Sequence, residues 1–162
     1  MSNLHHMPLS SPALSRFESF KASLPLKVAA TAQGVGGFIT FDFGREQSRD
    51  SVTGQAQYDW HLWVYMCDWD LFHDDSRILW RRESNNRLAA NILAQLDGES
   101  LLAIDRDEVD DCFTLVFSGG FRLHMDPDFF DFEAENDLFM LFRHGEEDCL
   151  SYSPKRRFYR AA

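Results

Sequence analysis

The most constraining feature of the sequence is a pair of alternating segments on either side of residues 118–120. Apolar side chains occupy every second position in both segments, which is typical of strands with one buried face. A two-residue Gly-Gly loop would pair Phe117 with Arg122 and mix the two faces. A three-residue loop pairs Phe117 with Phe121 and keeps the apolar side chains together. The sequence therefore predicts a β-hairpin over residues 112–126 with a three-residue loop.

Alternation of this kind recurs along the chain, whereas helical spacing occurs twice. One helix is expected to start at Pro12 after Ser11 and to end before Pro25, and the other to run from Ser84 to Gly98. Strands are expected over 26–31, 38–43, 58–67, 78–81, 99–105, 138–143 and 149–153, in addition to the hairpin. These patterns predict an α+β fold, with a mostly antiparallel, strongly twisted sheet of six or more strands and one or two short helices packed on it.

Length and composition favour one soluble domain. A chain of 162 residues is enough for a single domain over residues 12–162, preceded by a loose N-terminus over 1–11. The three widely spaced cysteines indicate free thiols and a cytoplasmic location. The net charge of −10 argues against nucleic-acid binding, and the apolar runs are too short for a membrane span. No cofactor motif is found, so no cofactor is expected.

The negative charge is concentrated in one part of the chain. Residues 105–148 contain 14 acidic and 3 basic residues, a net charge of −11. A stretch of this kind is typical of a solvated surface, or of a docking surface that attracts a basic protein partner. Aromatic residues within the stretch would supply the apolar centre of such an interface. The candidate partner-binding residues are Asp126, Asp128, Phe129, Phe130, Asp131, Glu133 and Glu135.

The strand over residues 58–67 supports a second hypothesis. Both of its faces are apolar, which indicates a central strand covered on both sides, or a face covered by a second copy of the chain in a homo-oligomer. Trp60, Trp63 and Tyr65 are candidates for lining a small-molecule pocket. Trp60 and Trp63 lie on opposite faces of a regular strand, so they cannot both line one cleft.

The polar segment that follows, residues 68–75, is expected to be a strand end and a turn. Asp68, Asp70 and His73 are metal-type ligands and would be the active-site residues of a metal-dependent enzyme. Their spacing matches no zinc or calcium motif, and the commoner role of such residues is a solvated turn.

The order of segments from Trp60 onward also resembles a family. It comprises the tryptophan-rich strand 60–69, a helix ending in 93–98, a strand over 101–105, the hairpin segment 114–123 and a strand over 138–142. This order resembles small uncharacterised bacterial proteins, some of which resemble immunity proteins of polymorphic toxin systems. The resemblance implies a non-catalytic inhibitor and no active-site residues. Together with the charge pattern, it favours a bacterial protein-binding module that docks a basic partner.

Overall fold

A computed structural model describes residues 12–161, so the predicted loose terminus over 1–11 lies outside the described residues. This part of the chain forms eleven strands and two α-helices. The helices are α1 (Pro12–Ala22) and α2 (Asn86–Leu93). The strands are β1 (Leu26–Gln33), β2 (Ile39–Arg49), β3 (Ala56–Val64), β4 (Asp68–His73), β5 (Ser76–Trp80), β6 (Ser100–Asp107), β7 (Cys112–Phe117), β8 (Phe121–Asp126), β9 (Phe139–Arg143), β10 (Cys149–Ser153) and β11 (Arg157–Ala161). The predicted α+β fold is confirmed.

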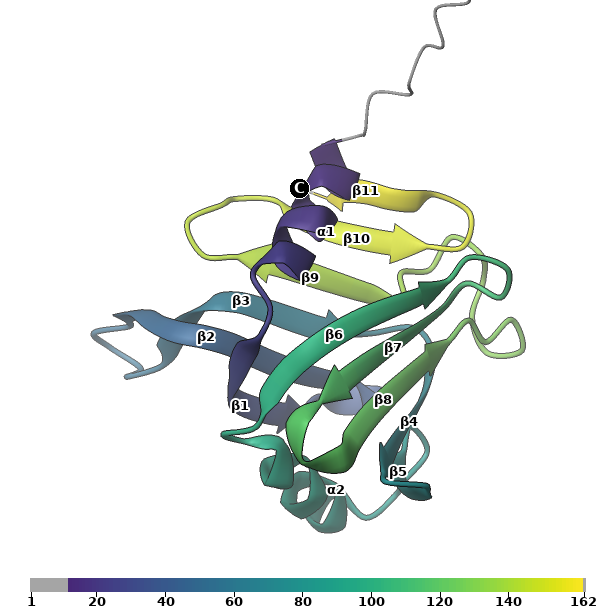
Figure 1. The fold of residues 1–162 in the computed structure, drawn as a ribbon, viewed down its shortest axis with the longest axis horizontal. Coiled ribbons are helices and arrows are strands. Elements are labelled where there is room, and N and C mark those ends of the chain that lie inside the picture. Colours follow the sequence, from purple (N-terminus) through teal and green to yellow (C-terminus); the bar gives the residue numbers. More distant parts are fainter. Residues whose placement is uncertain (1–11, 162) are drawn as a thin grey trace, which may run out of the picture.

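All the strands belong to one antiparallel sheet, in the order β11-β10-β9-β3-β2-β1-β6-β7-β8-β4-β5. The sheet bends sharply between β1 and β6, where the pairing is reduced to Leu26–Leu101 and Lys27–Ser100. The bend divides the sheet into two limbs, one from β11 to β1 and the other from β6 to β5 in the strand order. Figure 1 shows β6, β7 and β8 crossing over the limb that contains β1, β2 and β3. The two limbs therefore face each other and enclose the core between them.

Aromatic side chains fill the space between the limbs. The Phe113 ring lies 5.0 Å from the Phe139 ring and 4.8 Å from the Tyr152 ring, measured between centroids. Phe17 of α1 contacts both limbs, since its ring lies 6.2 Å from Phe113 and 4.6 Å from Phe158. Burying one such side chain contributes about 1.5–3 kcal/mol, so α1 stabilises the fold by closing the open side of the bent sheet.

The predicted hairpin is confirmed in its register. Leu115 pairs with Leu123, and Phe113 pairs with Met125, all with buried side chains. The loop is Ser118–Gly120, in which Gly119 has a φ of 76°. This left-handed conformation favours glycine, which explains why the loop sequence suits a three-residue connection.

Residues 68–73, which were expected to form a strand end and a turn, are the strand β4. Trp69 and Leu71 are buried, while Asp68 and Asp70 lie on the opposite face. The sequence interpretation was wrong because it treated the carboxylates as a turn signal. They occupy alternate positions of a strand whose other face belongs to the core.

The second helix is confirmed as α2, which begins at Asn86, two residues later than the expected start at Ser84. Ala89, Leu93 and Leu96 are buried, whereas Leu88 is 44% exposed. The N-cap is Asn85, whose side chain accepts a hydrogen bond from the Leu88 amide. The helix therefore buries the side that faces the sheet and exposes the opposite side.

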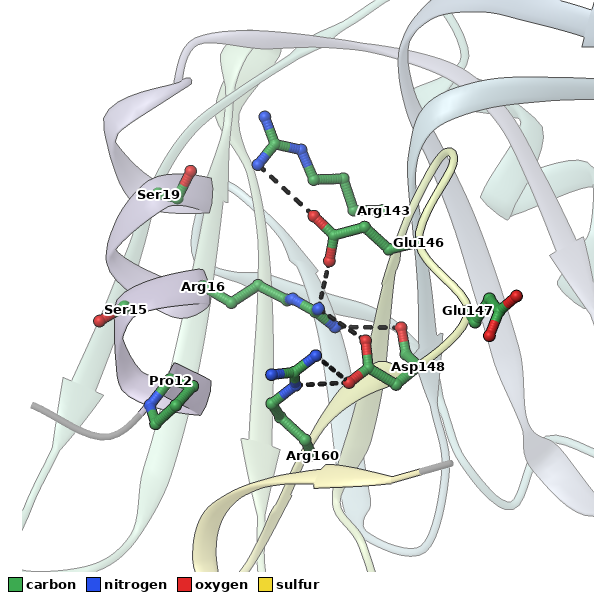
Figure 2. Close-up of a pocket in the computed structure, with 9 residues that line it drawn as sticks. All are labelled: Pro12, Ser15, Arg16, Ser19, Arg143, Glu146, Glu147, Asp148 and Arg160. Carbon is green, nitrogen blue, oxygen red and sulfur yellow. Dashed lines mark hydrogen bonds and ion pairs between the residues drawn. The ribbon is translucent and has the colours of Figure 1, made fainter.

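The first helix is attached to the sheet by ion pairs as well as by Phe17. Figure 2 shows Arg16 reaching from α1 to the loop between β9 and β10. The Arg16 Nη2 atom lies 2.7 Å from Asp148 Oδ1 and also contacts Glu146, and Arg160 of β11 contacts Asp148 as well. These two guanidinium groups lower the pKa of Asp148 to about 2. The open depression beside them, about 860 Å³, is thus lined mainly by charges that already have partners, among them Arg16, Glu146 and Asp148.

Candidate binding surface

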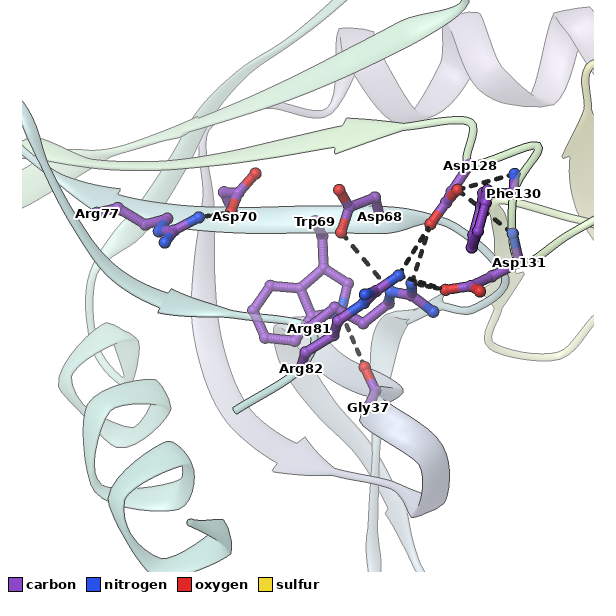
Figure 3. Close-up of polar contacts among 10 residues, drawn as sticks. All are labelled: Gly37, Asp68, Trp69, Asp70, Arg77, Arg81, Arg82, Asp128, Phe130 and Asp131. Carbon is purple, nitrogen blue, oxygen red and sulfur yellow. Dashed lines mark hydrogen bonds and ion pairs between the residues drawn. The ribbon is translucent and has the colours of Figure 1, made fainter. Parts of the chain in front are cut away.

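A buried arginine organises the acidic segment that follows β8. The Arg81 side chain is only 8% exposed, and its Nη2 atom lies 3.0 Å from Asp128 Oδ2 and 2.6 Å from Asp131 Oδ2 (Figure 3). Its Nε atom lies 3.6 Å from Asp68 Oδ1, and its guanidinium carbon lies 4.8 Å from the Phe132 ring centroid. The hydrogen bond from Arg81 holds the pKa of Asp131 below its usual value. One cation therefore ties this segment to β4 and β5.

The same contacts fix the residues that we call the aromatic loop, 127–137. The Asp128 side chain accepts a hydrogen bond from the Phe130 amide at 3.0 Å, and its carbonyl accepts one from the Phe132 amide at 2.8 Å. Phe132 packs on Arg81, whereas Phe129 is 65% exposed and Phe130 is 94% exposed. The loop therefore holds two neighbouring aromatic side chains in solvent.

Several carboxylates of the predicted partner-binding set have partners within the chain. Asp128 and Asp131 contact Arg81, and Glu135 contacts Lys155 at 2.9 Å. Glu133 is exposed, and its backbone amide donates a hydrogen bond to the Asn136 side chain. The structure thus brings the seven predicted residues into one loop and the adjoining end of β8, with part of their charge neutralised.

The basic C-terminus supplies more of this internal neutralisation. It forms β11, a strand that the sequence patterns did not predict. This strand pairs with β10, with Arg157 opposite Ser153 at one end and Ala161 opposite Cys149 at the other. Arg157 contacts Asp111, and Arg160 contacts Asp148. Asp111 lies in the turn between β6 and β7, and Asp148 lies just before β10, so these contacts do not neutralise the carboxylates on the outer face of β6, β7, β8 and β4.

We call this outer surface the acidic face. The strand registers align its residues in two rows that cross four strands. One row is Asp107, Cys112, Asp126 and Asp68, and the other is Asp105, Thr114, His124 and Asp70. Burial and the neighbouring Asp70 carboxylate raise the pKa of Asp68, which shows that the negative charges affect one another. The face continues directly into the aromatic loop.

The candidate pocket residues are divided between two environments. Trp60 is buried in the core, 5.1 Å from the Phe20 ring, while Trp63 and Tyr65 pack together on the outer face at 4.8 Å. The opposite placement of Trp60 and Trp63 agrees with the strand geometry. The outer face of β3 is half-buried, so it is only partly covered. None of the four open depressions described over residues 12–161 has a tryptophan in its lining.

The candidate metal ligands Asp68, Asp70 and His73 have separate contacts. Asp68 faces Arg81, and Asp70 lies 3.2 Å from Arg77. His73 stacks on the Phe121 ring at 4.5 Å, and its Nε2 atom lies 3.0 Å from the Gly119 carbonyl oxygen. The three side chains therefore do not converge on one point.

A different group of metal-type side chains does converge. Ligand atoms of Cys112, His124 and Asp126 all lie within 4.8 Å of one another, and the sequence interpretation had not connected them. Burial and the hydrogen bond to Asp126 raise the pKa of the Cys112 thiol to about 12. Cys67 is fully buried, which also raises the pKa of its thiol. These environments do not produce the low-pKa thiolate that a cysteine nucleophile needs.

The signal for this group was present in the hairpin register. A three-residue loop at 118–120 places Cys112 opposite Asp126, and Thr114 opposite His124, on the outward face. The register that pairs the apolar residues of the hairpin also pairs its polar residues, and it therefore predicts that Cys112, His124 and Asp126 lie together.

Comparison with protein-family models, curated proteins and solved structures gave no match. Among residues 12–161, neither helix has the length and apolar character that a membrane span requires.

Proposed function

We propose that the protein is a non-catalytic binding module of the bacterial cytoplasm that docks a basic protein partner through the aromatic loop and the acidic face. The observation that carries this proposal is the exposure of Phe129 and Phe130, 65% and 94%, on a loop held by Arg81. Exposed aromatic side chains beside the carboxylates of the acidic face have the composition of an interface centre and its rim.

The order of the loop before binding favours this role. A flexible loop would lose conformational entropy on docking, whereas the contacts of Arg81 with Asp128 and Asp131 have already fixed this one. The carboxylates of the acidic face would then speed the approach of a positively charged partner and make binding sensitive to salt.

The immunity-protein resemblance adds a partner class to this proposal. An inhibitor of that kind would cover a cationic surface on a toxin, and the acidic face supplies the complementary charge. Self-association through the same surface is disfavoured, because it would bring two acidic faces together.

The test is a pull-down from the native cell lysate at low and at high salt, followed by titration calorimetry with the retained protein. We expect one basic protein that is retained at low salt and weakened at high salt. The double variant Phe129→Ser/Phe130→Ser should weaken its binding by about 10-fold or more.

The matched control is Val52→Ser, which changes a side chain that is 92% exposed on the turn between β2 and β3. The control should bind like the wild type. Equal binding by the double variant, or the absence of any basic protein among those retained, would overturn the proposal.

A further inference from the structure

The hairpin of β7 and β8 brings three different metal-type side chains together. Cys112 and Asp126 face each other across the strand pair, and His124 lies one row further along on the same face. Their ligand atoms lie within 4.8 Å of one another. Sulfur, imidazole nitrogen and carboxylate oxygen are the three donor types that zinc sites use in proteins.

The separations require little adjustment to accept an ion. Tetrahedral zinc with bonds of about 2.0–2.3 Å holds its ligand atoms about 3.3–3.8 Å apart. The Cys112 thiol already contacts Asp126 Oδ1, and His124 Nε2 lies 3.0 Å from Asp126 Oδ2. The side chains of His124 and Asp126 are 35% and 41% exposed, so both have room to rotate.

Thr114 orients the histidine for this purpose. Its Oγ1 atom lies 3.1 Å from His124 Nδ1, on the side of the ring away from Asp126. In the metal-bound form, Nδ1–H would donate to Thr114 Oγ1, and Nε2, on the side of Asp126, would be left to bind the ion. Metal-binding histidines are held in this way by a second hydrogen bond.

The surroundings favour a cation. Asp107 pairs with Cys112 in the register of β6 and β7, and Asp110 lies in the lining of the same open depression, about 580 Å³. An added dication would relieve the repulsion among these carboxylates. The depression leaves a fourth position for water or for one of the flanking carboxylates.

We propose that Cys112, His124 and Asp126 bind a divalent transition-metal ion of the zinc type, with Thr114 as the residue that positions His124. Metal binding is measured on the isolated protein, without a partner. A negative result for the metal site would therefore leave the proposed docking function unaffected, and a negative result for docking would leave the metal site unaffected.

The experiment titrates the reduced, full-length protein with Co²⁺ and follows thiolate-to-cobalt absorption, with Zn²⁺ competition giving the zinc affinity. We expect the wild type to develop the absorption and to lose it when Zn²⁺ is added. Cys112→Ser should abolish the absorption, His124→Gln should weaken binding strongly, and Thr114→Val should weaken it by about 10-fold.

Three controls separate this site from other donors. Cys149→Ala removes a buried thiol outside the group, and His144→Gln removes an exposed imidazole outside it. The double variant His5→Gln/His6→Gln removes the adjacent N-terminal histidines. All three should bind as the wild type does.

Circular dichroism would verify that each variant is folded before the comparison is made. The proposal is overturned by a folded wild type that shows no thiolate absorption with Co²⁺ in excess. It is also overturned if Cys112→Ser keeps that absorption, or if the His5→Gln/His6→Gln variant loses it.

Discussion

Replacing Arg81 with methionine tests whether one cation holds the aromatic loop in place. Methionine keeps most of the apolar stem of Arg81 but removes the guanidinium group, with its charge, its hydrogen bonds and its contact with the Phe132 ring. In Arg81→Met, Asp128 and Asp131 lose their contacts with Arg81 at 3.0 and 2.6 Å, although Asp131 keeps its contact with Arg82, and Asp68 loses its contact with Arg81. The three carboxylates would then repel one another.

The cost follows from the burial of the groups. A hydrogen bond to a charged group contributes about 1.5–3 kcal/mol. We assign the contact with Asp128 to the upper part of that range, because the Asp128 side chain is only 17% exposed. The contact with Asp131, which is 36% exposed, is more strongly screened. We therefore expect a loss of about 3 kcal/mol in the free energy of unfolding, which lowers the Tm by about 6–12 °C for a domain of this size.

Arg82→Met is the matched control. Arg82 contacts the same Asp131 at 2.6 Å, but its side chain is 52% exposed, so its loss should cost less than about 1 kcal/mol. Urea denaturation followed by circular dichroism measures both variants. In an Asp128→Asn/Asp131→Asn background the Arg81→Met cost should shrink. Equal stability of Arg81→Met and Arg82→Met, within about 0.5 kcal/mol, would refute the reasoning.

Three further predictions concern other parts of the fold. The lowered pKa of Asp148, about 2 against 3.8, means that its stabilisation is present above pH 3.8 and lost as the pH falls toward 2, so the Tm difference between wild type and Asp148→Asn should shrink over that interval. Gly37→Ala places a Cβ 2.6 Å from the Arg81 carbonyl oxygen, whereas Gly54→Ala meets nothing within 4 Å at a similar positive φ; urea titration should show Gly37→Ala to be less stable by about 1–3 kcal/mol. Tyr152→Phe removes a hydroxyl bonded to two arginines and an aspartate, and thermal unfolding should show a loss of about 1–3 kcal/mol.

The parts of the fold that could be predicted from the sequence are those in which neighbouring residues determine the result. The hairpin of β7 and β8 is the clearest case, because only one loop length keeps Phe117 opposite an apolar residue. The C-terminal strand could not be found in this way. Its sequence, RFYRA, lacks a regular apolar alternation, and β11 exists because β10 offers it an edge to pair with.

The candidate binding surface likewise has a part that the sequence predicts and a part that it does not. The sequence places the acidic and aromatic residues of 126–135 close together, but it cannot show that Arg81, 47 residues before Asp128, is buried against them. That contact changes the role of the acidic residues in this segment. Two of its carboxylates stabilise the loop, so the two exposed phenylalanines are the residues of this segment that are most available to a partner.

The metal-type group and the docking surface share the acidic face, and this has a consequence for both. A dication at Cys112, His124 and Asp126 would cancel part of the negative charge in the row that also contains Asp68 and Asp107. If docking depends on long-range attraction, zinc should slow the association with a basic partner. The contact of Phe129 and Phe130, which governs dissociation, should be unaffected because these rings lie on the loop beyond the site.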